Sequence, residues 1–247
     1  MTARFLRYLP LFLLGLAWEA VARFHLVSSS ALPPLSDIVA AWIDLALSGD
    51  LLVNGAASLW RAGAGLALAI AIGAVLGVLM ARSRGAERLC GPLVEAFYPL
   101  PKSALIPVTA LWLGFGDGSK ILLIALGCML PVTIGAYNGA KSAERTLVWS
   151  ALSMGASRWR AVVDVVLPCA LPELMNGIRT ALALAFVLLI SSELIVARSG
   201  FGYLIGILGS NGTYAPMFAV VFTVAALGFL ADRIFQLLMR RALRWRE

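Results

Sequence analysis

The sequence predicts an all-α, polytopic membrane protein with six transmembrane helices and a cytoplasmic helical insert, in one domain over residues 1–247. Of its 247 residues, 61% are hydrophobic and only 13% are charged, and the mean hydropathy is +0.90. A soluble domain carries about 25% charged residues. Long apolar stretches recur along the chain, and short polar or basic segments separate them. These features are typical of a protein that crosses the bilayer several times.

The predicted spans lie at residues 8–23, 58–81, 94–113, 120–138, 178–197 and 215–238. The first apolar stretch follows Arg4 and Arg7 and therefore has the charge pattern of a signal peptide. No clear small-residue cleavage site follows it, so we interpret it as the first span.

The distribution of basic residues predicts the orientation. Arg4 and Arg7 place the N-terminus in the cytoplasm, and alternation of the spans then places 16 of the 20 Lys and Arg residues on that side. Both termini are expected to be cytoplasmic. Because the basic residues lie between spans and form no single stripe, the net charge of +7 reflects topology and does not indicate nucleic-acid binding.

Residues 27–57 are expected outside, with a helix lying at the outer membrane surface. Ser36 is the predicted cap of this helix, and Gly49 follows its end. Glu19 and Arg23, four residues apart near the outer end of span one, are expected to form an ion pair.

Small residues recur at four-residue spacing in span two, at Gly65, Ala69, Gly73 and Gly77. Such a stripe lets helix backbones approach closely in lipid. It packs either within the same subunit, which we favour, or against a second copy of the chain.

Span three begins with a proline-rich stretch in which Glu95 and Lys102 are seven residues apart. Irregular backbone at membrane depth occurs where protein or a water-filled cavity satisfies it. If the helix continues, the two charged groups share one face and line a cavity. The alternative is that both reach the inner interface with extended side chains. In span four, a kink is expected near the middle, at Met129, Pro131 and Thr133.

Residues 141–179 form the long polar and basic interruption between spans four and five. The half before Gly155 favours a helix, and Ser157 can cap a second short helix that is expected to stop before Pro168. Gly155 is expected to adopt a positive φ between them. Two short helices hinged at a glycine form a compact knob that fits a groove on a partner.

The insert resembles the EAA loop of inner-membrane permease subunits of bacterial ABC importers, whose pattern is E-A-A-x-x-x-G-x9-I-x-L-P. Gly155, Leu167 and Pro168 match this pattern, and Val165 replaces the isoleucine. The three E-A-A positions hold Trp149, Ser150 and Ala151. The first of these positions therefore lacks the glutamate of relatives and any polar contact that it makes.

Three further segments resemble the nitrate, sulfonate and taurine branch of this family. They are LPPLSDIVAAW from Leu32, LWLGFGDGSK from Leu111 and SGFGYLI from Ser199. The resemblance implies a permease subunit that forms the translocation pathway for a small solute, such as nitrate, a sulfonate or taurine, in a bacterial inner membrane. Pyrimidine-type vitamin precursors are also handled in this branch.

The resemblance implies several partners: a second copy of the chain, two ATPase subunits at the insert, and an extracytoplasmic solute-binding protein. The sequence contains no ATP-binding motif, so ATP and Mg²⁺ are expected on the ATPase subunits, with no cofactor, metal or catalytic residue on this chain. The residues expected to couple to the ATPase are Gly155, Ala156, Ser157, Arg158, Trp159, Arg160, Leu167 and Pro168. The residues expected in the pathway are Glu95, Tyr98, Lys102, Met129, Ser191, Ser192 and Glu193.

Two other functions were weighed. Residues 114–117 spell the GxGD signature of intramembrane aspartyl proteases, which need a second aspartate beside the first. Asp232 is expected near the inner end of span six and Asp117 outside, which favours a tight outer turn. A self-sufficient secondary transporter would show inverted repeats, and none is evident in the sequence.

Overall fold

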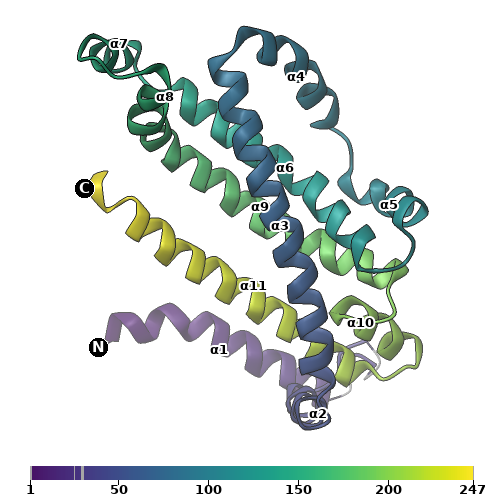
Figure 1. The fold of residues 1–247 in the computed structure, drawn as a ribbon. Coiled ribbons are helices and arrows are strands. Elements are labelled where there is room, and N and C mark those ends of the chain that lie inside the picture. Colours follow the sequence, from purple (N-terminus) through teal and green to yellow (C-terminus); the bar gives the residue numbers. More distant parts are fainter. Residues whose placement is uncertain (1, 25, 29–30, 247) are drawn as a thin grey trace. The chain divides into compact units, whose positions relative to one another are not determined.

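A computed structural model of the chain describes residues 2–24, 26–28 and 31–246 (Figure 1). Helices and their connecting turns account for all regular structure in these residues, which contain no strand. The all-α prediction is confirmed. Four helical runs in the described chain are long and apolar enough to cross a membrane, at Asp50–Arg82, Asp117–Lys141, Arg158–Val196 and Tyr214–Ala242.

The helices are α1 (Thr2–Arg23), α2 (Leu35–Leu47), α3 (Asp50–Arg82), α4 (Arg84–Phe97), α5 (Ile106–Leu113), α6 (Asp117–Lys141), α7 (Arg145–Ser153), α8 (Arg158–Ala161), α9 (Leu167–Val196), α10 (Phe201–Ser210) and α11 (Tyr214–Ala242). Short 3₁₀ segments lie at Lys102–Leu105 and Arg244–Arg246, and a π-helical segment lies at Val162–Val166. The chain divides into two compact units. One comprises Met1–Ser58 and Arg198–Leu227, and the other comprises Leu59–Ala197 and Gly228–Glu247.

In the first unit, a carboxylate on α1 caps the start of α2. Glu19 Oε2 accepts hydrogen bonds from the backbone N–H groups of Leu35, at 2.7 Å, and Ser36, at 3.3 Å. A negative group suits the unsatisfied N–H groups of a helix start. The prediction that Ser36 caps this helix is wrong, because the helix already begins at Leu35. The predicted Glu19–Arg23 ion pair is confirmed, with 2.6 Å between the charged atoms.

Aromatic side chains hold α1, α2 and the first half of α11 together in the same unit. The Trp18 ring lies 5.9 Å from that of Phe218 and 6.0 Å from that of Phe222, measured between centroids. The Trp42 indole N–H donates to Thr223 Oγ1 at 3.0 Å. This unit therefore packs through large rings with satisfied polar edges.

In the second unit, the small-residue stripe of α3 packs against α6. A Cβ added at Gly73 would lie 2.9 Å from the Met129 carbonyl oxygen, and one added at Gly77 would lie 2.6 Å from Ala136 Cβ. Ala69, on the same stripe, is fully buried. The prediction that the stripe faces its own subunit is confirmed.

The opposite side of α6 packs equally closely against α9, which runs alongside it in Figure 1. A Cβ at Gly139 would lie 2.5 Å from the Ala170 carbonyl oxygen, and one at Gly177 would lie 2.5 Å from the Pro131 carbonyl oxygen. Backbone therefore meets backbone, as small residues permit in lipid. The buried apolar side chains around this contact include Leu123, Ile124, Val132, Leu188 and Leu189.

Two predicted spans have different boundaries in the structure. The helix of span two begins at Asp50, because the turn at Gly49, with φ +85°, joins it directly to α2. The continuous span predicted over 94–113 is wrong, since α4 ends at Phe97 and α5 begins at Ile106. Prolines in the intervening segment remove backbone donors and interrupt the helix. Glu95 and Lys102 therefore do not share one helix face.

The predicted stop before Pro168 is also wrong. Helical structure continues from Arg158 to Val196, a run of 39 residues. Pro168 falls in the first turn of α9, and the π-helical segment Val162–Val166 precedes it. A π turn alters the local hydrogen-bond register, and a proline in a first turn removes a donor that has no intrahelical partner in that position. The insert thus leads without a break into a membrane-spanning helix.

We predict that Gly139→Ala lowers the free energy of unfolding by about 1–3 kcal/mol, because the added methyl group collides with the α9 backbone. Thermal unfolding of the purified protein in detergent measures this loss. Gly63→Ala is the matched control, since a Cβ at Gly63 meets nothing within 4 Å. That change should be neutral or stabilising by up to about 1 kcal/mol. Equal effects at the two positions would contradict the close packing of α6 on α9.

Candidate coupling surface and membrane-embedded polar sites

The insert turns sharply at Gly155, between α7 and α8. Gly155 has φ +88°, which confirms the predicted positive φ. Its N–H donates to the Leu152 carbonyl at 3.0 Å, and the Ala156 N–H donates to the Ala151 carbonyl at 3.0 Å. These two bonds form a glycine C-terminal cap of α7. The Ser157 hydroxyl accepts from the Arg160 N–H at 3.2 Å, so the predicted cap of the second short helix is confirmed.

One side of the insert is anchored to the adjoining helix ends. Val148, Ala161 and Val166 are buried in a small apolar cluster with Ala140 of α6 and Ala170 of α9. The insert therefore has its own core, which is continuous with the ends of two long helices. These contacts join the insert to the ends of α6 and α9.

The other side of the insert exposes large apolar side chains beside cations. Trp149 is 68% exposed, Met154 80% and Trp159 74%. Arg158 and Arg160 are exposed next to Trp159. We call these five residues the coupling surface. Trp, Met and Arg are the residue types enriched in protein interfaces, and exposed apolar groups clustered in this way mark interaction sites.

The remaining predicted coupling residues lie in different environments. Ala156 is half-buried in the turn, and Ser157 is committed to capping α8. Leu167 and Pro168 lie in the first turn of α9, beyond the π-helical segment. In the structure they connect the insert to the span and do not belong to the coupling surface.

An ionic cluster joins three helices of the second unit, with Arg61 and Glu193 buried and Asp117 exposed. Arg61 of α3 donates through Nε to Asp117 Oδ1 at 2.8 Å, and through Nη1 to Glu193 Oε1 at 2.7 Å. Arg61 is 4% exposed and Glu193 1% exposed. The sequence interpretation placed Glu193 in the pathway, and it missed Arg61 as the partner. The opposite charges of Arg61 and Glu193, near the outer ends of two predicted spans, were the available signal.

Lys120 lies near this ionic cluster, in the first turn of α6. It is 1% exposed, and its Nζ donates to the carbonyl oxygens of Phe115 at 2.5 Å, Gly116 at 3.0 Å and Val196 at 2.9 Å. Val196 is the last residue of α9, where a cation is favoured by the helix dipole. Lys120 therefore ties the end of α9 to the turn before α6.

The two aspartates of the protease alternative are paired with different arginines. Asp117 binds Arg61, whereas Asp232 binds Arg179 through Nε at 2.7 Å. Protease aspartates share a proton between two adjacent carboxylates, and this arrangement provides no such pair. The segment 114–117 forms a turn with Gly114 at φ +73°, as expected of a tight turn. Among the described residues, no group of three or more His, Cys, Asp or Glu could hold a metal ion.

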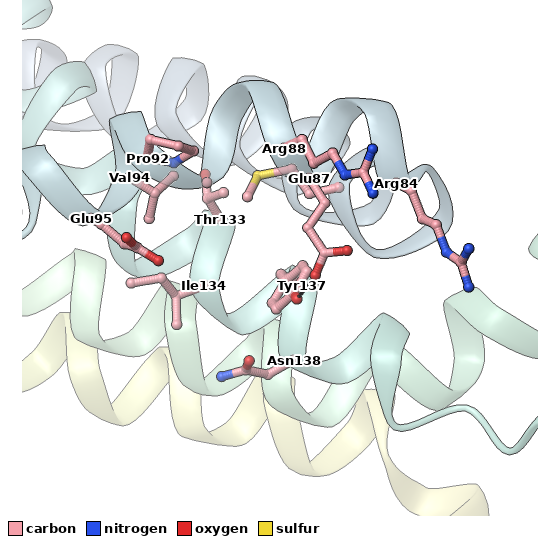
Figure 2. A pocket seen from close by; sticks show the side chains of 12 residues that line it. Arg84, Glu87, Arg88, Pro92, Val94, Glu95, Thr133, Ile134, Tyr137 and Asn138 are labelled. Atoms are coloured by element: carbon pink, nitrogen blue, oxygen red, sulfur yellow. Dashed lines mark hydrogen bonds between the residues drawn. The ribbon is translucent and has the colours of Figure 1, made fainter.

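A polar cavity of about 680 Å³ lies between α4 and α6 (Figure 2). Its lining includes Glu95, one of the predicted pathway residues, together with Asn138. Figure 2 shows the carboxylate of Glu87 directed toward Tyr137, whose hydroxyl donates to it. Lys141 Nζ also donates to this carboxylate at 3.0 Å. The Tyr137 hydroxyl bond and then Lys141 lower the pKa of Glu87, so this wall of the cavity keeps its negative charge.

A second polar cavity of about 560 Å³ contains two more predicted pathway residues, Tyr98 and Lys102. Lys102 Nζ donates to the Tyr98 carbonyl at 2.5 Å. Asn138 of α6 lines both cavities, which therefore adjoin each other along this helix. Three of the predicted pathway residues thus line adjoining cavities on α6.

The other predicted pathway residues lie elsewhere. Met129 packs against the apolar core and lines a separate apolar cavity of about 200 Å³. Ser192 is buried, and its hydroxyl donates to the Leu189 carbonyl at 2.8 Å. Ser191 is half-buried beside it, and Glu193 belongs to the ionic cluster. None of these four residues lines the two polar cavities.

Residues 69–244 match the family model described as "Binding-protein-dependent transport system inner membrane component". The chain belongs to this family. It is 32% identical to the taurine transport system permease protein TauC of Escherichia coli K12, over 92% of this chain and 85% of that protein. It is 37% identical to SsuC of the same organism, named for aliphatic sulfonates transport, over 97% of this chain and 92% of that protein.

The fold is also that of a solved ABC transporter. The MetNI methionine ABC transporter, crystallised in inward-facing conformations, matches 79% of this permease and 97% of its own chain with a TM-score of 0.68. The sequence identity in that match is 21%. The sequence-based expectation of a multi-pass permease subunit of an ABC importer is confirmed. The protease and secondary-transporter alternatives are not supported.

We predict that the Arg61–Glu193 pair of this permease is strongly coupled. Arg61→Met or Glu193→Leu alone leaves a buried charge and should cost about 3–5 kcal/mol of unfolding free energy. The double variant should lose clearly less than the sum of the two, as measured by thermal unfolding in detergent. The more exposed Arg179–Asp232 pair is the control and should couple by about 1 kcal/mol or less. Strict additivity at Arg61 and Glu193 would show that the cluster does not act as a unit.

Proposed function

We propose that this permease conducts a small organic sulfonate, of the taurine or alkanesulfonate class, into a bacterial cell as part of an ATP-driven importer. The observation that carries the proposal is its similarity to TauC and SsuC along nearly its whole length. The whole chain acts as one permease domain. A second substrate class is supported by ThiX of Halalkalibacterium halodurans, named for formylaminopyrimidine transport, which is 31% identical over 95% of this chain.

Two ATPase subunits bind at the coupling surfaces of two permease copies in this proposal. The exposed Trp149, Met154 and Trp159 supply apolar anchors, and Arg158 and Arg160 supply charge that orients the partner. ATP and Mg²⁺ bind to the ATPase subunits, and this chain hydrolyses no ATP itself. The absence of a phosphate-binding loop from the sequence supports this division of labour.

The structure suggests how movement of the insert would reach the membrane. The helical run that starts at Arg158 continues to Val196, so the insert is a direct extension of a spanning helix. Close packing of α9 on α6 would carry the displacement to the helix that lines both polar cavities. Closure of the ATPase pair would in this way open and close the pathway.

A second copy and an extracytoplasmic solute-binding protein complete the importer. The most apolar stretch of α11 is only 11% buried within the chain, which leaves Phe229, Leu230 and Leu237 for lipid or the second copy. The solute-binding protein delivers the sulfonate on the outer side.

The insert and both termini face the cytoplasm in the proposed orientation. Arg82 ends α3, Arg84 and Arg88 lie in the first two turns of α4, and Arg240 and Arg241 lie in the last turn of α11, as the positive-inside rule expects. The side chains of Arg4 and Arg7, on which the N-terminal orientation was predicted, lie outside the described residues. An outward-facing insert could not bind a cytoplasmic ATPase, so co-purification of that ATPase also tests the orientation.

We predict ATP-dependent uptake of labelled taurine or ethanesulfonate by vesicles that contain the permease, its ATPase and its solute-binding protein. Each of the two sulfonates should inhibit uptake of the other, because both present the same anionic group. A formylaminopyrimidine should not compete. Uptake of the pyrimidine with no sulfonate uptake would overturn the substrate assignment and leave the importer function intact.

We predict that Gly155→Asp weakens binding of the ATPase about tenfold, because it adds an unpaired charge and alters the bend beside the coupling surface. Co-purification of the ATPase and membrane abundance of the permease measure the effect. Abundance should be retained, since a Cβ at Gly155 meets nothing within 4 Å and aspartate tolerates a positive φ better than most residues.

Gly212→Asp is the matched control for this experiment. Gly212 has φ +74° and open space around its Cβ position, but it lies in the turn between α10 and α11. This variant should keep ATPase binding. If both variants bound the ATPase equally well, the insert would not be the coupling element.

A further inference from the structure

Lys102 is the unusual cation of the second unit. It lies at the start of the 3₁₀ segment between α4 and α5, and its side chain is half-buried. Within residues 2–24, 26–28 and 31–246 it forms no ion pair. Its ammonium group donates to one carbonyl oxygen, that of Tyr98, and lies 5.8 Å from the centroid of the Tyr98 ring. A charge at membrane depth usually has a partner, a pathway or a ligand.

The cavity beside Lys102 is partly open, and its lining mixes polar with apolar side chains. Asn138 and Asn176 bring amide donors to it, and the Tyr98 ring adds a flat apolar wall. Thr180 also lines it, and its hydroxyl donates to the Asn176 carbonyl at 3.1 Å. Its volume of about 560 Å³ falls within the range of small-molecule sites and exceeds that of a two-carbon sulfonate. Lys102 also lines the neighbouring apolar cavity, which is consistent with an apolar environment for its methylene chain.

One carboxylate shares this lining and lies at the far end of it. Glu173 packs its backbone against Gly135, whereas the Lys102 side chain lies beside Gly127 on the same face of α6. Eight residues of helix separate these glycines, which corresponds to about 12 Å. Glu173 forms no ion pair with Lys102 among the described residues.

We propose that the cavity formed by Tyr98, Lys102, Asn138, Asn176 and Thr180 is an anion-binding site within the pathway, and that it takes the sulfonate group of the transported solute. Lys102 supplies the counter-charge, and the amide groups of Asn138 and Asn176 supply directed hydrogen bonds. The inference rests on the proposed function for the identity of the solute, and it assigns to the permease a selectivity of its own. The alternative is that Lys102 extends to a lipid headgroup and leaves the cavity without preference for charge.

Chemical labelling tests the site in the full-length permease, purified in lipid nanodiscs. Asn176→Cys is introduced after the half-buried Cys90 and Cys169 are replaced by serine, while Cys128 is fully buried. Two thiol reagents of similar size are compared, 2-sulfonatoethyl methanethiosulfonate and 2-trimethylammonioethyl methanethiosulfonate. The first carries the proposed ligand group, and the second carries the opposite charge. A sample without Asn176→Cys gives the background rate.

We expect the sulfonate reagent to be favoured, and Lys102→Gln to lower the ratio of the two rates about tenfold, as removal of one nearby charge requires. Lys102→Arg should keep the ratio. Lys141→Gln is the matched control, since Lys141, the last residue of α6, pairs with Glu87 and lines neither this cavity nor the apolar one. An unchanged ratio in Lys102→Gln, or an equal fall in Lys141→Gln, would overturn the proposal.

Protection by a free ligand gives a second measurement that needs no change at Lys102. Ethanesulfonate should slow labelling of Asn176→Cys, and neutral ethanesulfonamide at the same concentration should not. Equal protection by both, or by neither, would contradict an anion site. Uptake and labelling can fail separately. If the importer takes up sulfonates but labelling shows no charge preference, the anion site is refuted and the proposed substrate stands. If labelling shows a charge preference but no sulfonate is taken up, only the proposed substrate is refuted.

Discussion

The second unit depends on the close approach of α6 to both α3 and α9. In lipid the apolar side chains gain little by leaving their solvent, so helices associate through direct contact and internal polar bonds. Here glycines remove the side chains that would keep backbones apart, with Gly73 and Gly77 on one side of α6 and Gly139 and Gly177 on the other. Contacts this close leave little freedom for one helix to slide or rotate past another. The positions of the cavity-lining residues of α6 follow from that fixed register, as does the position of its first turn in the ionic cluster.

Ion pairs hold the same three helices together at the start of α6 and the end of α9. Arg61, Asp117 and Glu193 come one from each of α3, α6 and α9, and Lys120 joins the end of α9 to the turn before α6. Two positive and two negative groups balance, whereas one isolated charge in a bilayer costs about 2.5–3.5 kcal/mol on insertion scales. One end of α9 continues into the insert, and the ionic cluster lies at the opposite end of this helix. A displacement that enters α9 at the insert therefore ends at a point held by several ionic contacts.

Local sequence patterns predicted those features whose causes are local. The four-residue spacing in α3, the turn at Gly155 and the cap by Ser157 each depend on residues within one or two helical turns. Features produced by distant residues were missed or wrong. Glu19 caps a helix that begins 16 residues later, and Arg61 meets Glu193 132 residues along the chain. The stop at Pro168 failed for another reason: a π-helical segment changes the position of the proline within the helix, and no residue pattern announces it.

Two lysines of the second unit show how the structure separates a structural charge from one available to a ligand. Lys120 is enclosed, and three carbonyl oxygens use the three donors of its ammonium group. Lys102 is half-buried and donates to a single carbonyl, so its other donors face a cavity lined by amides and a hydroxyl. The local sequence does not distinguish these two lysines, since both follow a turn at the edge of an apolar stretch. The number of oxygen atoms around each ammonium group does distinguish them: Lys120 uses its donors within the fold, whereas Lys102 keeps donors for the proposed anion.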